Sequence, residues 1–169
     1  MHFGFSYVGF IFLMLLMIPN LIWTRNKPKD YEHYQYQENK YLSILERIGE
    51  VLVTCLILIF SDFNWQPWTN WNWWLMAASF CMILYEMFWI RYFMGPKRMP
   101  DLCTTFLKIP VAGASLPVLA VLCISIYGKN PFLTLASIIL GIGHIGIHLQ
   151  YQNMIKKDNQ QFIYIFLFM

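Results

Sequence analysis

"PFLTLASIILGIGHIGIHL", residues 131–149, decides the fold of this chain because it is an apolar run long enough to cross a membrane. The run contains no charged residue, and a helix of about 20 residues crosses the roughly 30 Å hydrocarbon core of a bilayer. Two histidines, His144 and His148, are spaced one helical turn apart near its end. The run therefore predicts a membrane-spanning helix that carries two imidazoles on one face.

Four further apolar runs precede this one, and the composition of the whole chain agrees with them. Of its 169 residues, 58% are hydrophobic and only 12% are charged, whereas about 25% of the residues in a soluble domain are charged. The N-terminal run lacks the basic segment and the cleavage site of a signal peptide, so we expect it to be kept as a span. We predict an all-α fold, a polytopic transmembrane bundle in one membrane domain over residues 1–169, with spans at about 3–23, 42–60, 73–93, 109–127 and 131–149.

The last residues of the chain, "FIYIFLFM" at 162–169, are also apolar. As a helix they would measure about 12 Å, which is too short to cross the bilayer. Three placements stay open for this tail: the membrane interface, the surface of the bundle, or a contact with another subunit.

The basic residues of the loops predict the orientation of the bundle. The loop between the last two spans carries Lys129, and the tryptophan-rich segment 61–72 carries no basic residue. By the positive-inside rule, the N-terminus lies outside and the C-terminus is cytoplasmic. Lysine and arginine residues that gather in alternate loops are typical of a membrane protein, where they set its orientation, so we expect no nucleic-acid partner. The basic residues on the cytoplasmic side are Arg25, Lys27, Lys29, Lys40, Lys97, Arg98, Lys108, Lys156 and Lys157.

Five tryptophans, Trp65, Trp68, Trp71, Trp73 and Trp74, fall at the outer interface in this orientation. Indole rings prefer the membrane interface, so an aromatic belt is the preferred interpretation. A tryptophan-rich mouth of a ligand site is the alternative, and the sequence alone does not separate the two.

Several ionisable or polar residues lie inside the predicted spans. Such residues are costly in hydrocarbon and generally face the bundle interior or a water-filled cavity. Counting 1.5 Å per residue from the cytoplasmic ends places Glu50, Glu86 and His144 at similar depths, roughly 7–11 Å inside. The pocket candidates in this cytoplasmic half are Asn20, Glu46, Glu50, Glu86, His144 and His148.

Each candidate also has a purely structural interpretation. Glu46 would pair with Arg47 or a basic loop, and the histidines would satisfy each other or a backbone carbonyl freed by Pro19. The functional hypothesis is that Glu50 and Glu86 join the two histidines in one buried cluster of carboxylates and imidazoles.

Three chemistries suit such a cluster. Imidazole and carboxylate bind Zn, Fe or Mn, which makes His144, His148, Glu50 and Glu86 metal-ligand candidates, although HxxxH spacing is unspecific and no HExxH motif is present. The same groups suit a proton relay, because imidazole titrates near neutral pH. They also suit a pocket for a lipid headgroup. Whether any cofactor binds stays open.

Five segments resemble an uncharacterised family of small five-helix bacterial integral membrane proteins. They are "IPNLIWTRNKPKDYE" (18–32), "ERIGEVLVTCLILIFSDFN" (46–64), "YEMFWIRYF" (85–93), "IPVAGASLPV" (109–118) and "GIGHIGIHLQ" (141–150). The resemblance covers most of the chain up to about Gln150. It implies a multi-pass protein of the bacterial plasma (inner) membrane and implies no activity.

Three functional hypotheses follow. The first is a small integral membrane protein whose polar pocket, in the cytoplasmic half of the bundle, binds or transports a small solute, an ion or a lipid. The second is a membrane-embedded enzyme that modifies a lipid or isoprenoid, with Glu50 or Glu86 as acid or base. The third is an accessory subunit that joins an oligomer or a partner protein. The first is preferred because it explains buried ionisable groups without a catalytic motif.

Overall fold

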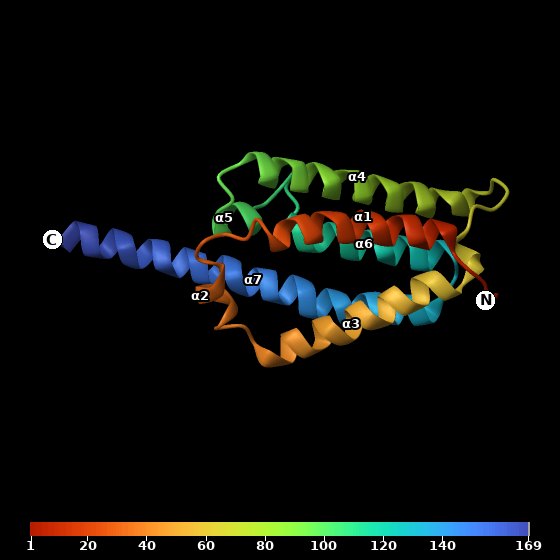
Figure 1. The fold of residues 1–169 in the computed structure, drawn as a ribbon, viewed down its shortest axis with the longest axis horizontal. Helices are drawn as coiled ribbons and strands as arrows, with labels where there is room; N and C mark the ends of the chain where they lie inside the picture. The colour runs from red at the N-terminus through yellow and green to blue at the C-terminus, as the bar shows by residue number, and fades with distance from the viewer. Residues whose placement is uncertain (169) are drawn as a thin grey trace.

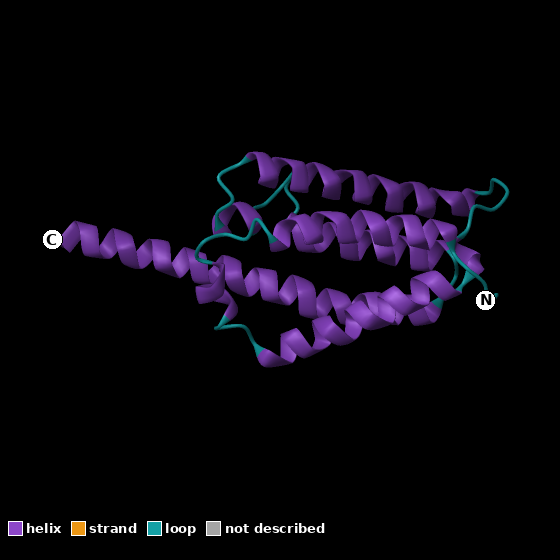
Figure 2. Ribbon diagram, viewed as in Figure 1, coloured by secondary structure: helices purple, strands orange, loops and turns teal. Residues whose placement is uncertain are grey.

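Five long helices run side by side in the computed structural model, which describes the backbone of residues 1–168 and the side chains of residues 1–160 (Figure 1). No strand occurs in the described residues (Figure 2). The long helices are α1 (Tyr7–Thr24), α3 (Lys40–Ile59), α4 (Trp73–Met94), α6 (Ala112–Tyr127) and α7 (Pro131–Phe168). The short helices α2 (Tyr31–Gln35) and α5 (Met99–Leu102) lie at one end of the bundle, and the 3₁₀ turns η1 (Ser61–Phe63) and η2 (Asn70–Asn72) lie at the other.

Three of these helices are long and apolar enough to cross a membrane, namely α1, α4 with the turn before it, and α7. Helix α6 is apolar but has 16 residues, which corresponds to about 24 Å. Helix α3 is long enough but carries Glu46, Arg47 and Glu50 near its middle. Length and composition therefore identify three of the five predicted spans.

Helix α7 differs most from its prediction. The predicted span ends at residue 149, whereas the helix continues to Phe168. The segment after residue 149 is polar but contains neither glycine nor proline up to Gln160, so nothing in it breaks a helix. Of the apolar tail predicted at 162–169, the backbone through Phe168 belongs to this helix, and its side chains lie outside the described residues.

Helix α6 forms the centre of the bundle, packed against α4 on one side and α7 on the other. Leu119 is the only exposed side chain within it. Gly113 permits the close packing against α4, because a Cβ there would lie 2.6 Å from the Phe88 ring. The outward faces of the other helices expose large apolar side chains, as a lipid-facing surface does. These include Phe10, Ile11 and Met14 of α1, Phe80, Ile83 and Met87 of α4, and Leu135, Ile138 and Ile142 of α7.

Helices α3 and α7 approach each other until their backbones touch. A Cβ added to Gly49 would lie 2.5 Å from Cα of Leu140, and one added to Gly143 would lie 2.3 Å from the backbone nitrogen of Glu46. Small residues at a crossing allow this approach between membrane helices. The crossing fixes the register between the two helices and thereby the neighbours of Glu46.

One of the five tryptophans, Trp71, holds together the end of the bundle opposite α2 and α5. The indole nitrogen of Trp71 donates to the backbone carbonyls of Ile126 and Tyr127 at 3.0 and 2.9 Å, which are carbonyls at the end of α6. Such carbonyls have no partner within their own helix. All five tryptophans are exposed, as the residues of an aromatic belt are.

Candidate functional site

His144 and His148 lie next to each other on α7, and a carboxylate of α3 meets the first of them. The two ring centroids are 4.9 Å apart. Nδ1 of His144 lies 2.5 Å from Oε1 of Glu46, and both side chains are largely buried. Glu46 reaches this position because it shares a helix face with the buried Gly49 and Val53.

The polar contacts continue along α7 toward the end of the bundle that carries α2. The ring of Tyr151 lies 6.0 Å from that of His148, and its hydroxyl donates to Oε1 of Glu38, just before α3. Ser43 donates from its hydroxyl to the other oxygen of Glu38 at 3.2 Å. Two hydrogen bonds, Glu46 to His144 and Tyr151 to Glu38, are thus joined through the rings of His144, His148 and Tyr151. The residues Glu46, His144, His148, Tyr151 and Glu38 are called here the polar row.

Two tyrosines of α2 pack against the polar row at Tyr151. The rings of Tyr31 and Tyr34 lie edge-on to Tyr151, at 6.2 and 6.5 Å. Tyr34 also donates to Oδ2 of Asp158 at 2.9 Å. Burial, together with this bond to a carboxylate, raises the pKa of Tyr34 to about 12. Its hydroxyl therefore stays a hydrogen-bond donor at neutral pH.

One polar atom of the row is unsatisfied. Nδ1 of His148 is buried and makes no hydrogen bond to any described residue. A buried polar group without a partner costs about 1–3 kcal/mol. The imidazole of His148 is therefore not explained by structural hydrogen bonding alone.

Glu50 does not join the histidines. Its side chain is 45% exposed and forms an ion pair with Arg47 at 3.1 Å on the outward side of α3. The prediction placed Glu50 in the cluster because its depth along α3 matches that of His144 along α7. The close crossing at Gly49 and Gly143 instead brings Glu46 against α7.

Glu86 and Asn20 also lie outside the polar row. Glu86 is half-buried on α4, and its Oε1 has no hydrogen-bond partner among the described residues. The side chain of Asn20 donates to the carbonyl of Leu16 at 2.7 Å and to the hydroxyl of Tyr85 at 3.1 Å. Asn20 thus forms a hydrogen bond to the helix backbone near Pro19. The structure does not bring the six predicted pocket residues into one cluster.

The described residues offer no group of three or more His, Cys, Asp or Glu side chains that could hold a metal ion. His144 and His148 are adjacent, but Glu50 and Glu86, the other two metal-ligand candidates, face elsewhere. The four predicted metal-ligand candidates therefore do not come together in the described residues.

Sequence reasoning missed Glu38. It lies in a polar loop before the second predicted span, where a carboxylate is ordinarily solvated. The signal that could have found it is Tyr151, which follows His148 by three residues and so shares its helix face.

Comparisons with protein-family models, curated proteins and solved structures found no match. The resemblance to small bacterial membrane proteins therefore stays a prediction. The functional argument rests on the geometry of the polar row.

Proposed function

We propose that this protein is a multi-pass membrane protein whose polar row binds an ion from the cytoplasm, and that the ion is a proton. The observation that carries the proposal is the contact between Glu46 and His144, with His148 beside it. A carboxylate and an imidazole in contact share a proton readily, and imidazole changes charge near neutral pH. Tyr151 and Glu38 link this pair to the end of the bundle.

A proton suits the row better than a larger ligand does. The side chains of the row contact one another directly. Two cavities, of about 470 and 460 Å³, are lined by other residues.

The ionisable side chains of α3 and α7 extend from the polar row toward the α2 end of the bundle and not toward the other end. Beyond Glu46 in that other direction, the charged residues of α3 are Arg47 and Glu50, which pair with each other on the outward side. On α7 no such residue lies between Pro131 and His144. A proton bound at Glu46 and His144 therefore enters and leaves by the cytoplasmic end, so the site stores a proton or couples it to another event.

The proton proposal can be tested by nitrogen-15 NMR of histidine side chains in lipid nanodiscs across pH 5–8. We expect Glu46→Gln to change the nitrogen-15 spectrum of His144, which loses its carboxylate partner, while Glu50→Gln leaves it as in the parent protein. Glu50 is a matched control because it lies on the same helix but faces outward. Identical His144 spectra in the parent and Glu46→Gln at every pH would contradict the proposal.

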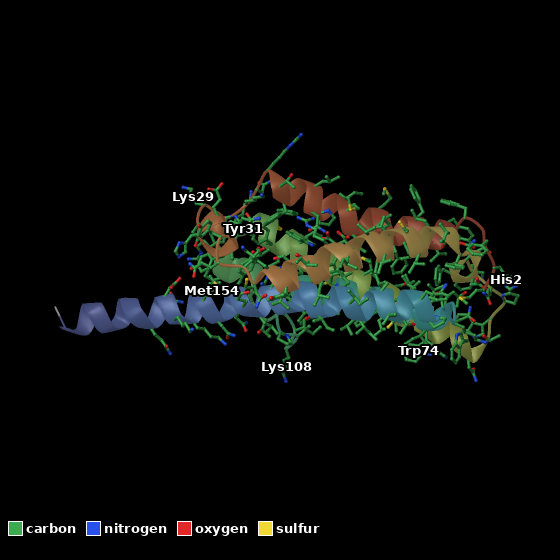
Figure 3. The ribbon with its side chains drawn as sticks, turned by 90° about the horizontal axis from the view of Figure 1, so that it is seen from below. His2, Lys29, Tyr31, Trp74, Lys108 and Met154 are labelled. Atoms are coloured by element: carbon green, nitrogen blue, oxygen red, sulfur yellow. The ribbon has the colours of Figure 1, made fainter. Side chains whose placement is uncertain are left out.

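We further propose that all five long helices cross the plasma membrane, with the N-terminus outside. Helices α3 and α6 run alongside the three apolar ones (Figure 1). The basic loops gather at the end that carries α2 and α5. Figure 3 places Lys29 and Tyr31 at this end and His2 and Trp74 at the other.

Reporter fusions test this topology. A fluorescent protein fused to the C-terminus should fluoresce in the cytoplasm, and alkaline phosphatase inserted next to Lys129 should be active outside. Alkaline phosphatase fused to the N-terminus behind a cleavable signal should also be active. A cytoplasmic N-terminus would overturn both the orientation and the side from which the polar row opens.

A second candidate function is that of an accessory subunit, and α7 favours it. The 38 residues of α7 correspond to about 57 Å, nearly twice the hydrocarbon thickness. Its C-terminal part projects beyond the rest of the bundle (Figure 1). A projecting helix of this kind offers a contact surface for a partner subunit or a second copy.

A further inference from the structure

A cavity of about 460 Å³ lies at the end of the bundle that carries α2 and α5. Three segments far apart in sequence form it: the start of α2, the loop after α4, and the part of α7 near Ile155. Its lining includes the cations Lys29, Lys97 and Arg98 and one carboxylate, Asp30. The lining residues therefore carry a formal charge of +2 at neutral pH, with Asp101 on Arg98 and Asp158 on Tyr34 as neighbouring carboxylates.

The three cations differ in how firmly they are held. The ammonium of Lys97 donates to Oδ1 of Asn26 at 2.7 Å, which ties it to the loop after α1. Arg98 uses Nε for Asp101 at 3.3 Å, and its two terminal nitrogens form no hydrogen bond to a described residue. Lys29 forms no ion pair within residues 1–160 and is exposed at this end of the bundle (Figure 3). The cavity thus retains donors for a further anion.

The cavity also lies at the ends of two helices that are long and apolar enough to cross a membrane. Its cationic residues follow directly on the ends of α1 at Thr24 and α4 at Met94, two helices able to cross a membrane. Beside the cations the lining contains apolar surface from Ile155 and Pro100. Cations next to apolar surface at the end of a span match a lipid, whose phosphate adjoins its glycerol and acyl chains. Basic pockets between membrane helices bind anionic headgroups in this way.

We propose that this cavity binds the phosphate of an anionic phospholipid. Lys29 and Arg98 would pair with the phosphate, the guanidinium through its free terminal nitrogens. Lys97 would add its charge while staying bound to Asn26. The proposal does not depend on proton binding in the polar row, since no residue is shared between the two sites. Inorganic phosphate offers the same chemistry, so the experiment must distinguish the two sources.

Native mass spectrometry in detergent, with titration of phosphatidylglycerol or phosphatidylcholine, tests the proposal. We expect the parent protein to retain one phosphatidylglycerol molecule in preference to phosphatidylcholine. The double variant Lys29→Gln/Arg98→Gln should bind it at least about 10-fold more weakly, because each basic residue near an anionic lipid contributes about a factor of five. Both side chains are exposed, so the variant should fold, which circular dichroism checks.

The matched control is Lys156→Gln/Lys157→Gln, which removes the same charge from exposed positions of α7 outside the cavity lining. It should weaken binding by less than about 2-fold. Equal weakening in both double variants would show diffuse attraction instead of a site and would overturn the proposal, as would unchanged binding in Lys29→Gln/Arg98→Gln. If 10 mM inorganic phosphate displaces the lipid completely, free phosphate is the ligand and the lipid assignment is wrong.

Discussion

Replacing Gly143 with alanine is expected to destabilise the bundle by more than about 2 kcal/mol, and replacement with leucine to prevent folding. The added Cβ would lie 2.3 Å from the backbone nitrogen of Glu46. Alanine is a better helix former than glycine by about 1 kcal/mol, but a clash with backbone cannot be relieved by a rotamer change. Overpacking of ordinary cores costs about 1–3 kcal/mol, and here a whole helix must move. The steric cost therefore exceeds the gain in helix propensity.

Unfolding in mixed detergent micelles, followed by circular dichroism, would measure this effect. Gly146→Ala is the matched control, because its Cβ would meet only the side chain of Leu42 at 3.1 Å. That side chain can shift, so the control should be within about 1 kcal/mol of the parent protein. Gly49→Ala, whose Cβ would lie 2.5 Å from Cα of Leu140, should behave like Gly143→Ala. If Gly143→Ala is as stable as Gly146→Ala, the helices do not cross as closely as described.

Local sequence pattern predicts the helices of this protein well, since apolar runs bounded by polar loops specify where a helix lies. The run predicted at 73–93 is α4, Trp73–Met94, and the run predicted at 42–60 is α3, Lys40–Ile59. The span predicted at 131–149 lies within α7, and the helix continues beyond it to Phe168. The polar segment after residue 149 stays helical because it contains neither glycine nor proline up to Gln160.

The neighbours of each polar side chain could not be predicted in the same way. Glu46 and Glu50 are one turn apart, and a count of residues places both on a broad inner face. Which of them meets His144 depends on where α3 and α7 cross, and that depends on two glycines 94 residues apart in the sequence. The depth of a residue along its helix likewise does not say which neighbouring helix its side chain faces. Glu86 was placed near the histidines by its depth alone, whereas it lies on α4, which packs mainly against α6. Which helices pack against each other is decided by the tertiary structure, and the spacing of apolar residues along the sequence does not specify it.

Removing the carboxylate of Glu46 is expected to cost about 1–2 kcal/mol of stability, most of it through His144. Hydrogen bonds between membrane helices contribute about 0.6 kcal/mol on average and up to about 1.7. Bonds to a charged group contribute about 1.5–3 kcal/mol in proteins generally. The 2.5 Å contact between Oε1 of Glu46 and Nδ1 of His144 is largely buried, so we expect a value toward the upper end of the membrane range.

A double-mutant cycle of Glu46→Gln and His144→Leu isolates this contribution. The coupling energy should be about 1–2 kcal/mol in detergent unfolding at pH 7. Glu50→Gln should change stability by less than about 0.5 kcal/mol, because an exposed ion pair contributes little and the Arg47 partner is 80% exposed. A coupling energy near zero, or a loss in Glu50→Gln equal to that in Glu46→Gln, would mean that α3 presents the other carboxylate to α7. Proton binding would then have to be assigned to a different pair, because the polar row begins at the contact that this cycle measures.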